Sequence, residues 1–424
     1  MFDKLSQIWK IKDLRNKILF VLALLFISRV AAHIPVPGID TVGLKKLFDS
    51  SQVLGLMNIF AGGAMENFSI VMLGVGPYIT SSIIFQLLTM VVPSLEELSK
   101  EGEYGRGKIN QWTRWLTVPL AFLQSYGMIA LLERSAGNVL GNITSWQLIV
   151  AMCTITAGTM FLMWLGELIT EKHVGNGISL LIFAGIVSGL PGSFSKTVAT
   201  FNAAEIINMV IFALIALITI VGVVIITEGQ RNIPVSYARR VRGNKMFGGV
   251  DTHLPLRVNQ AGVIPIIFAI SIILFPPMVA QLFLRVNTVW VANFAQSVIN
   301  LFQNQIFYGV IYFTLVVAFT YFYTAVIFHP DQIAENLQKQ GGFVPGIRPG
   351  RSTADYLKKI VTRIILTGSL FLGLIAVLPL ITSQLTGTQS LVIGGTSLLI
   401  VVSVVIETVN QINAQLSMRD YEEI

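Results

Sequence analysis

The sequence predicts an all-α polytopic membrane protein with ten transmembrane helices and a short re-entrant helix. Three observations lead to this fold class. Hydrophobic residues make up 54% of the 424 residues and charged residues only 12%, whereas a soluble domain carries about 25% charged residues. The mean hydropathy of +0.72 leaves too little polar surface to cover a globule in water. The apolar residues also gather in stretches of about 17–25, a length that crosses a bilayer core of roughly 30 Å.

Ten apolar stretches follow one another along the chain, and each is predicted to be one span. They cover residues 18–36, 68–92, 112–132, 147–171, 177–191, 205–227, 259–283, 305–328, 360–380 and 390–411. Basic residues precede the first stretch in the manner of a signal peptide. However, Arg29 interrupts that stretch and many more spans follow. We therefore interpret the first stretch as a membrane helix and not as a cleaved signal.

The basic residues predict which side of the membrane each loop faces. Most of the 29 Lys and Arg residues lie in the N-terminal tail, in the loops 93–114, 228–258 and 329–359, and near the C-terminus. An even number of spans puts these regions on one side, which the positive-inside rule assigns to the cytoplasm. Because this charge lies between apolar stretches and not on one amphipathic face, the net charge of +7 does not indicate nucleic-acid binding.

One apolar segment, residues 54–65, is too short to cross the bilayer; we call it the re-entrant segment. It lies between the first two spans, on the extracytoplasmic side, and a stretch of this length is typical of a re-entrant or interfacial element. Gly55, Gly62 and Gly63 permit close packing and tight turns. Irregular backbone at membrane depth is tolerated only inside protein or along a cavity. The segment therefore either lies on the outer surface or folds into the bundle, and the residues alone favour neither.

The polar residues form no recognisable catalytic or metal site. None of the four histidines has a second ligand three or four residues further on, so metal binding is not expected. A G-x-x-x-x-G-K match at Gly102–Lys108 lacks the Ser or Thr that holds Mg²⁺ and follows no strand. Cys153 lies in an apolar run and is expected to be a small buried hydrophobe. We expect no enzyme activity, no metal and no cofactor.

Few charged residues lie within the predicted spans, which bears on the class of transport protein. An ion-coupled transporter usually carries ionisable groups near the bilayer midplane. Arg29, Glu167 and Glu407 lie toward span ends, where snorkelling or local pairing is favoured. A secondary transporter with a midplane substrate site remains an alternative, although this distribution weakens it.

The second and seventh spans contain unusual backbone. The second holds Gly74-Val75-Gly76-Pro77, and the seventh holds Gly262-Val263-Ile264-Pro265 and then Phe275-Pro276-Pro277. Because proline removes a helical hydrogen bond, we expect both helices to be kinked. The second span also combines a polar stripe with an aliphatic one, which suits a bundle interior that sometimes meets water.

Six stretches, in order along essentially the whole chain, together resemble the SecY family of bacterial protein-conducting channels. No single stretch would be sufficient. The stretches are Ile34–Asp40 (IPVPGID), Gly76–Ile79 with Gln86–Leu88 (GPYI, QLL), Gly175–Ser179 (GNGIS), Leu254–Asn259 (LPLRVN), Phe343–Gly350 (FVPGIRPG) and Gly394–Ile400 (GGTSLLI).

This resemblance implies an hourglass channel built from two pseudo-symmetric halves of five helices each. The N-terminal half would cover residues 1–200 and the C-terminal half residues 201–424. The repeat is not visible in the sequence and rests on the family alone. A side opening between the second and seventh spans would release signal sequences and membrane helices into lipid. The residues implied at this lateral gate are Ser82, Phe85, Gln86 and Phe275.

The resemblance also implies a ring of aliphatic side chains at the waist and a plug. A narrow apolar collar offers a moving chain no hydrogen bonds and resists water and ions by dewetting. The implied ring residues are Ile79, Ile83, Ile182, Ile186, Ile267 and Ile400. Residues 55–65 match the plug, a short helix that seals the idle channel, which favours the inward alternative for the re-entrant segment. The implied plug residues are Gly55, Leu56, Asn58, Ile59, Phe60, Gly62 and Gly63.

The two long basic loops match those that bind the ribosome or the SecA motor ATPase. In the first, Arg239, Arg240 and Arg242 could contact ribosomal RNA phosphates. In the second, Arg348 matches an arginine important for SecA coupling, and Arg351 follows it. The implied partners are SecE, SecG, SecA, the ribosome, substrates with signal sequences, and membrane lipid. The implied location is the plasma (inner) membrane of a bacterium, with both termini cytoplasmic.

Overall fold

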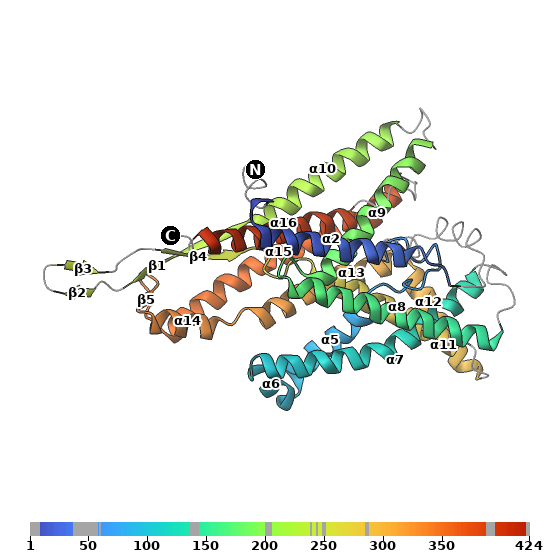
Figure 1. Cartoon of the computed structure of the whole chain (residues 1–424), viewed down its shortest axis with the longest axis horizontal. Helices are drawn as coiled ribbons and strands as arrows, with labels where there is room; N and C mark the ends of the chain where they lie inside the picture. Colours follow the sequence, from blue (N-terminus) through green and yellow to red (C-terminus); the bar gives the residue numbers. More distant parts are fainter. Residues whose placement is uncertain are drawn as a thin grey trace.

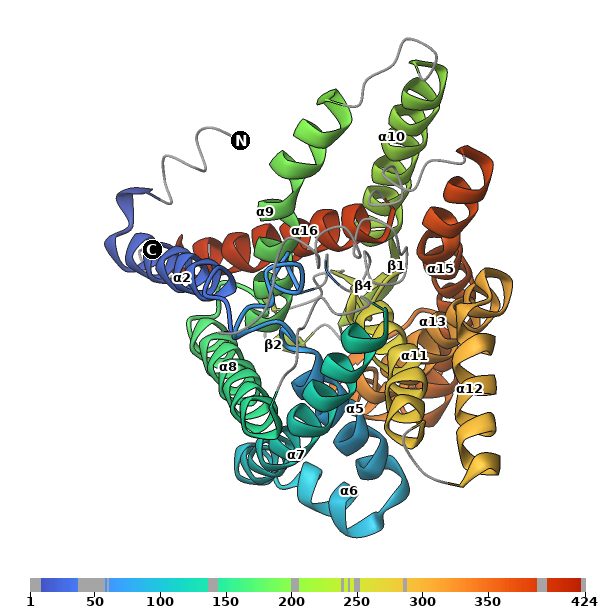
Figure 2. The same ribbon diagram turned by 90° about the vertical axis from the view of Figure 1, so that its right-hand side faces the viewer.

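The computed structural model is a bundle of long helices with short strands gathered at one end (Figure 1). It describes residues 9–36, 58, 61–135, 144–199, 206–237, 240–242, 245–247, 252–284, 288–386 and 395–420. Seen from its end, the bundle has α2, α7 and α8 on one side and α10, α13 and α15 on the other (Figure 2). The bounds of these helices follow.

Each of the ten predicted spans contains one long helix. In chain order these are α2 (Lys12–Ala32), α5 (Gly76–Val91), α7 (Glu103–Ser135), α8 (Ser145–Glu171), α9 (Gly177–Ala199), α10 (Ile206–Glu228), α11 (Ile264–Phe283), α13 (Gln305–Ile327), α15 (Arg351–Thr386) and α16 (Gly395–Asp420). Three shorter helices were not expected from the sequence: α6 (Pro93–Lys100), α12 (Val289–Gln303) and α14 (Pro330–Lys339).

Helix length and composition indicate which of the described helices are able to cross a membrane. Within the described ranges, 5 helices are long and apolar enough to cross a membrane, or up to 6 if the bent pair of α5 and α6 forms one span. Parts of α9 and α10, Gly177–Gly192 and Ala213–Glu228, are apolar but shorter. The chain is therefore a multi-pass helical membrane protein, and the count of ten crossings remains a prediction.

Two of the three predicted proline kinks are wrong, because the helices begin where the kinks were expected. Gly74 and Gly262 adopt left-handed backbone with φ of 58° and 63°, and each precedes a helix start by two residues. Pro77 and Pro265 therefore lie in the first helical turn, where the missing N–H has no partner to lose. Only the Pro276-Pro277 pair lies inside α11.

The second predicted span is also shorter than residues 68–92. Residues 61–75 form turns apart from a single bridge residue, α5 then runs for 16 residues, and the chain bends by 102° into α6. The turns place this part of the chain inside the bundle instead of along its length.

Cys153 is exposed on α8, so its predicted burial is wrong. The flanking Met152 and Ile155 are buried, because α8 packs against its neighbours through another face. In a membrane protein the lipid-facing surface is as apolar as the core. An apolar run therefore does not tell which of its faces is buried.

The loop 228–258 contains strands that the sequence analysis did not predict. β1 (Gln230–Tyr237) pairs antiparallel with β4 (Thr252–Arg257), and its last residues pair with β5 (Gly342–Phe343) of the other long loop. β2 (Arg240–Arg242) pairs with β3 (Lys245–Phe247). Ile233 and Leu256 of the first pair pack with Val344 and with α15 in a small second core. The two long loops are thus joined into one folded end.

Candidate functional site

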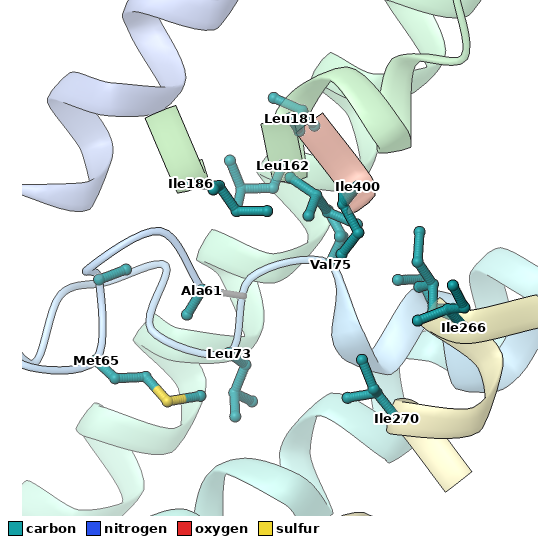
Figure 3. Close-up of a cluster of buried hydrophobic side chains, with 14 of the residues drawn as sticks. Ala61, Met65, Leu73, Val75, Leu162, Leu181, Ile186, Ile266, Ile270 and Ile400 are labelled. Atoms are coloured by element: carbon teal, nitrogen blue, oxygen red, sulfur yellow. The ribbon is translucent and has the colours of Figure 1, made fainter. Parts of the chain in front are cut away.

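The six isoleucines predicted to line the waist lie in one buried hydrophobic cluster. Two come from α5, two from α9, one from α11 and one from α16. None exposes more than 6% of its surface, and Ile400 exposes none. Figure 3 shows Ile186, Ile400 and Ile270 approaching from three different helices, with Val75 between them.

A cavity of about 90 Å³ lies beside this cluster. Its walls come from α5, α7, α9, α11 and the turns of residues 61–75, and they are mainly apolar. Three of the six ring isoleucines line it: Ile79, Ile182 and Ile267. The polar side chains in the lining are Thr80 of α5, Gln124 of α7 and Ser271 of α11. An apolar wall of this kind can contact a passing chain without binding it through hydrogen bonds.

Sequence reasoning missed several residues of this cavity. Gln124 and Met128 come from α7, and Leu274 and Met278 flank Phe275 on α11. Gln124 carried a usable signal, because it is a polar residue inside the apolar stretch 112–132 and is only 6% exposed. Leucine and methionine in an apolar span carry no such signal.

The described end of the re-entrant segment, residues 61–65, enters the bundle. Ala61 and Met65 are buried and line the cavity, and Figure 3 places both beside Leu73. The backbone of Gly62 approaches α9 so closely that a Cβ on Gly62 would lie 2.6 Å from the Cα of Gly185. Only a glycine at each position allows the two backbones to meet.

The described plug residues are tied to each other and to the following turn. The Asn58 side-chain amide donates to Glu66 at 2.9 Å, and the Glu66 N–H donates back to Asn58 at 3.1 Å. The Gly63 N–H donates to the Asn58 carbonyl at 2.8 Å. Of the seven predicted plug residues, four lie outside the described residues: Gly55, Leu56, Ile59 and Phe60.

The turns that follow the segment are fixed to the residues just after α2. The Val36 N–H donates to the Phe68 carbonyl at 2.9 Å, and the Ile70 N–H donates to the Ile34 carbonyl at 3.0 Å. On the other side, Gly158 of α8 lies so close to the Ile70 carbonyl that any Cβ would collide with it. The turn region is therefore held between α2 and α8.

Two of the charged residues in the predicted spans have local partners. The Arg29 Nη1 donates to the Gly62 carbonyl at 2.8 Å and to the Ser188 hydroxyl at 3.1 Å. Arg114 and Glu167 form an ion pair at 2.8 Å between α7 and α8. This agrees with the local pairing favoured from the sequence.

α5 and α11 pack side by side where the lateral gate is predicted (Figure 2). Phe275 lines the cavity on the α11 side. The other three predicted gate residues do not. The Gln86 amide donates to the Ser82 hydroxyl within α5 at 3.0 Å, and Phe85 contacts Trp112 of α7 with ring centroids 6.4 Å apart. Of the four predicted gate residues, Phe275 alone lines this cavity, and the gate itself remains a prediction.

The second long loop presents its arginines on a tight turn. Arg348 and Arg351 are exposed. Gly346 and Gly350 have φ of 83° and 94°, so the turn that carries Arg348 requires glycine at both positions. The Thr353 hydroxyl donates to the Arg348 carbonyl at 2.9 Å, which connects the turn to the start of α15.

The first long loop places Arg240 and Arg242 at the two ends of β2, opposite Phe247 and Lys245 of β3. Arg239 lies outside the described residues. On neighbouring α14, a hydrogen bond from Lys339 lowers the pKa of Glu335 from its ordinary value. The pairing of β1 with β5 brings both loops to one end of the molecule (Figure 1), where Arg348 and Arg351 are exposed.

Within the described ranges, no group of three or more His, Cys, Asp or Glu side chains could hold a metal ion. The site described above consists of apolar walls, the inward-folded residues 61–65 and hydrogen bonds.

Solved structures share this architecture. A protein-conducting channel has a TM-score of 0.64 at 16% identity, with 94% of this chain and 91% of that chain covered. Sec61 in a canine ribosome–channel complex from the endoplasmic reticulum has a TM-score of 0.61 at 16% identity, with the same coverage. A structure described as showing that the SecY plug domain stabilises the closed channel has a TM-score of 0.63 at 17% identity, also covering 94% and 91%. The fold is that of protein-conducting channels.

The sequence comparisons narrow this class to one family. The SecY family profile matches residues 69–409. The protein translocase subunit SecY of Corynebacterium glutamicum is 46% identical, covering 98% of both chains. The SecY of Mycobacterium tuberculosis is 44% identical, covering 97% of this chain and 96% of the relative. The chain belongs to the SecY family. It is the pore-forming subunit of a protein translocation channel and not an enzyme, which leaves no support for a secondary transporter.

Proposed function

We propose that unfolded polypeptides cross the membrane through the space beside the isoleucine cluster, and that hydrophobic segments leave it sideways between α5 and α11. The single observation that carries this proposal is the cavity. Its walls combine ring isoleucines with residues of α5 and α11 and with the re-entrant segment. One space is thus shared by the waist, the side opening and the segment that could block it.

In this proposal the six isoleucines form the collar. Their side chains are branched and carry no hydrogen-bonding groups, so a moving chain slides past them without being held. When no chain is present, such a collar resists water and ions by dewetting. The convergence of α5, α9, α11 and α16 on one cluster supports this role.

The re-entrant segment acts as the plug. Its buried Ala61 and Met65 occupy part of the cavity wall, so its removal would widen the space. The solved SecY structure whose plug domain stabilises the closed channel supports the same role here. The sealed arrangement corresponds to an idle channel.

The lateral gate separates two halves, residues 1–200 and 201–424. In Figure 2, α2, α7 and α8 of the first half lie opposite α11, α13 and α15 of the second, which supports this division, while α16 packs on α9. The contact between α5 and α11 is the place where they would part.

The folded end of the two long loops is the docking face for the SecA motor ATPase or the ribosome. The exposed Arg348 and Arg351, together with the arginines in the sequence of β2, support this assignment, since guanidinium groups suit acidic surfaces and phosphates. The remaining partners are SecE, SecG, substrates with signal sequences, and lipid. Because the relatives are bacterial, we place the protein in the bacterial inner membrane with both termini cytoplasmic.

Site-specific crosslinking of a stalled substrate tests the pore. The chain would be reconstituted with SecE and driven by SecA in liposomes, in a Cys153→Ser background. Ile83→Cys and Ile186→Cys should crosslink to a cysteine in the stalled secretory precursor. Leu217→Cys is the matched control, because it is 64% exposed on the outside of α10. If neither pore position crosslinks to a precursor that is shown to be stalled in the channel, the pore assignment is wrong.

A further inference from the structure

The contact between α2, α9 and the re-entrant segment is polar, although its surroundings are apolar. One nitrogen of Arg29, Nη1, donates both to the Gly62 carbonyl at 2.8 Å and to the Ser188 hydroxyl at 3.1 Å. Ser188 in turn donates to the Gly185 carbonyl at 2.8 Å. A single guanidinium thus joins three parts of the chain that are far apart in sequence.

The backbone geometry at this contact makes it specific. Gly62 has φ of 67°, a left-handed conformation that favours glycine. Its backbone lies against Gly185, one turn before Ser188 on α9. The Gly62 carbonyl is therefore presented to Arg29 only when the segment lies fully inward. If the segment moved outward, this charge-assisted hydrogen bond would be lost.

Further hydrogen bonds fix the described residues of the segment, 58 and 61–65, at their two ends. Asn58 and Glu66 close it by mutual hydrogen bonds, and the turns that follow it are fixed to Ile34 and Val36. Arg29 adds a side-chain hydrogen bond to the Gly62 carbonyl, which holds Gly62 against α9.

We propose that Arg29 is a positioning residue that latches the plug inward, by holding the Gly62 carbonyl against Ser188 of α9. The latch joins α2 to α9, which pack on each other and on α8, whereas the lateral gate lies between α5 and α11. Parting the gate therefore does not in itself break the latch. Plug release is a separate step, and the strength of the latch sets how often an idle channel leaks.

This proposal rests on the plug role proposed for the re-entrant segment. Its test therefore distinguishes failure of the latch from failure of the plug role. The full chain is reconstituted in planar bilayers without substrate, and its ion conductance is measured. Arg29→Met should raise the time-averaged conductance about tenfold, which corresponds to about 1.4 kcal/mol. Arg29→Lys should restore most of the seal, because an ammonium group can still donate to the Gly62 carbonyl. Arg15→Met, on the same helix near its other end, should leave the conductance unchanged.

Deletion of residues 58–65 provides the second arm. The deletion alone should raise the conductance, and adding Arg29→Met to it should produce no further rise. If the deletion leaves the conductance unchanged, the plug role itself is wrong. If the deletion raises the conductance but Arg29→Met does not, the plug stands and the latch is wrong. If Arg29→Met raises the conductance equally in both backgrounds, Arg29 acts elsewhere and the latch is also wrong.

A chemical readout covers the case in which Arg29→Met folds poorly. Ser188→Ala removes one acceptor of the latch and keeps the rest of α9. In a Cys153→Ser background, Ala61→Cys should react faster with a water-soluble maleimide once Ser188→Ala is added, because Ala61 is 8% exposed when latched. An unchanged labelling rate would contradict the latch.

Discussion

Ile186 shows what a pore residue looks like at the scale of a single side chain. It is 3% exposed and lies with Ile400 beside Val75, where four helices converge. The cluster to which it belongs consists of hydrophobic residues. The collar depends on this uniformity, because one polar group in a narrow apolar space gives water a place to bind.

We predict that Ile186→Ser raises the ion conductance of the idle channel severalfold, since the added hydroxyl lets water wet the collar. The measurement is the conductance of the reconstituted chain in planar bilayers. Ile218→Ser is the matched control, because Ile218 is 60% exposed on α10.

Truncating a buried isoleucine also costs about 2–5 kcal/mol of stability, so thermal unfolding of the two variants should be compared first. Equal conductance of a folded Ile186→Ser variant and the parent chain would exclude Ile186 from the collar.

The identity of individual pore residues was predictable only by resemblance. Nothing in the local sequence distinguishes Ile186 from Ile218, because both are isoleucines in apolar stretches. Cys153 illustrates the same difficulty, since it was expected in the core and is exposed. Gln124 is the opposite case, because an amide in an apolar span signals a protein-lined environment.

At the scale of elements, the glycine and proline residues correctly predicted where the backbone of the second and seventh spans is unusual. They wrongly predicted a helix kink near Pro77 and Pro265. The sequence indicated unusual backbone near Pro77 and Pro265. The structure shows helix starts there and not kinks. The physical reason is that proline is unfavourable inside a helix but favourable in its first turn. Sequence alone does not show on which side of the proline the helix lies.

The strands of the first long loop were missed for a related reason. Pro234 lies within β1, opposite His253 of β4, and a proline inside a run of residues is an argument against a strand. It is tolerated because β5 pairs only with Ser236 and Tyr237, which leaves Pro234 on an open edge. This pairing joins segments more than a hundred residues apart in the chain, so no local pattern could reveal it.

We predict that Ile233→Ala loosens this folded end, because Ile233 is 2% exposed and packs with Leu256 and Val344 in the second core. The expected local cost is about 2–5 kcal/mol. Limited proteolysis of the purified chain should therefore cleave residues 228–258 faster.

Arg231→Ala is the control for this prediction, since Arg231 is exposed on the same strand. Cleavage of both variants at the parent rate would show that the second core does not stabilise the loop.

At the scale of the whole molecule, the cavity places both sides of the gate within one space. Thr80 of α5 and Leu274 of α11 both line it. A link between these positions would hold the two helices together.

We predict that joining Thr80→Cys to Leu274→Cys with a reducible bifunctional thiol reagent stops both secretion and membrane insertion in reconstituted liposomes. The variant carries Cys153→Ser, so that only the new thiols react. Reduction of the linker should restore transport. Each single cysteine variant treated in the same way should remain active, and continued transport by the linked channel would rule out a gate between α5 and α11.

The sequence by itself determined the membrane class, the places of the long helices, the family and the existence of a segment too short to span. These properties follow from composition, from the length of apolar stretches and from short motifs, all of which are local. Only the tertiary structure decided that α5 and α11 begin at their prolines, that Cys153 is exposed, that β1 pairs across two loops, and that Arg29 contacts Gly62. Each of these depends on which surfaces meet after folding. In a chain whose helices are apolar on nearly every face, hydrophobicity does not specify which helix surfaces pack together.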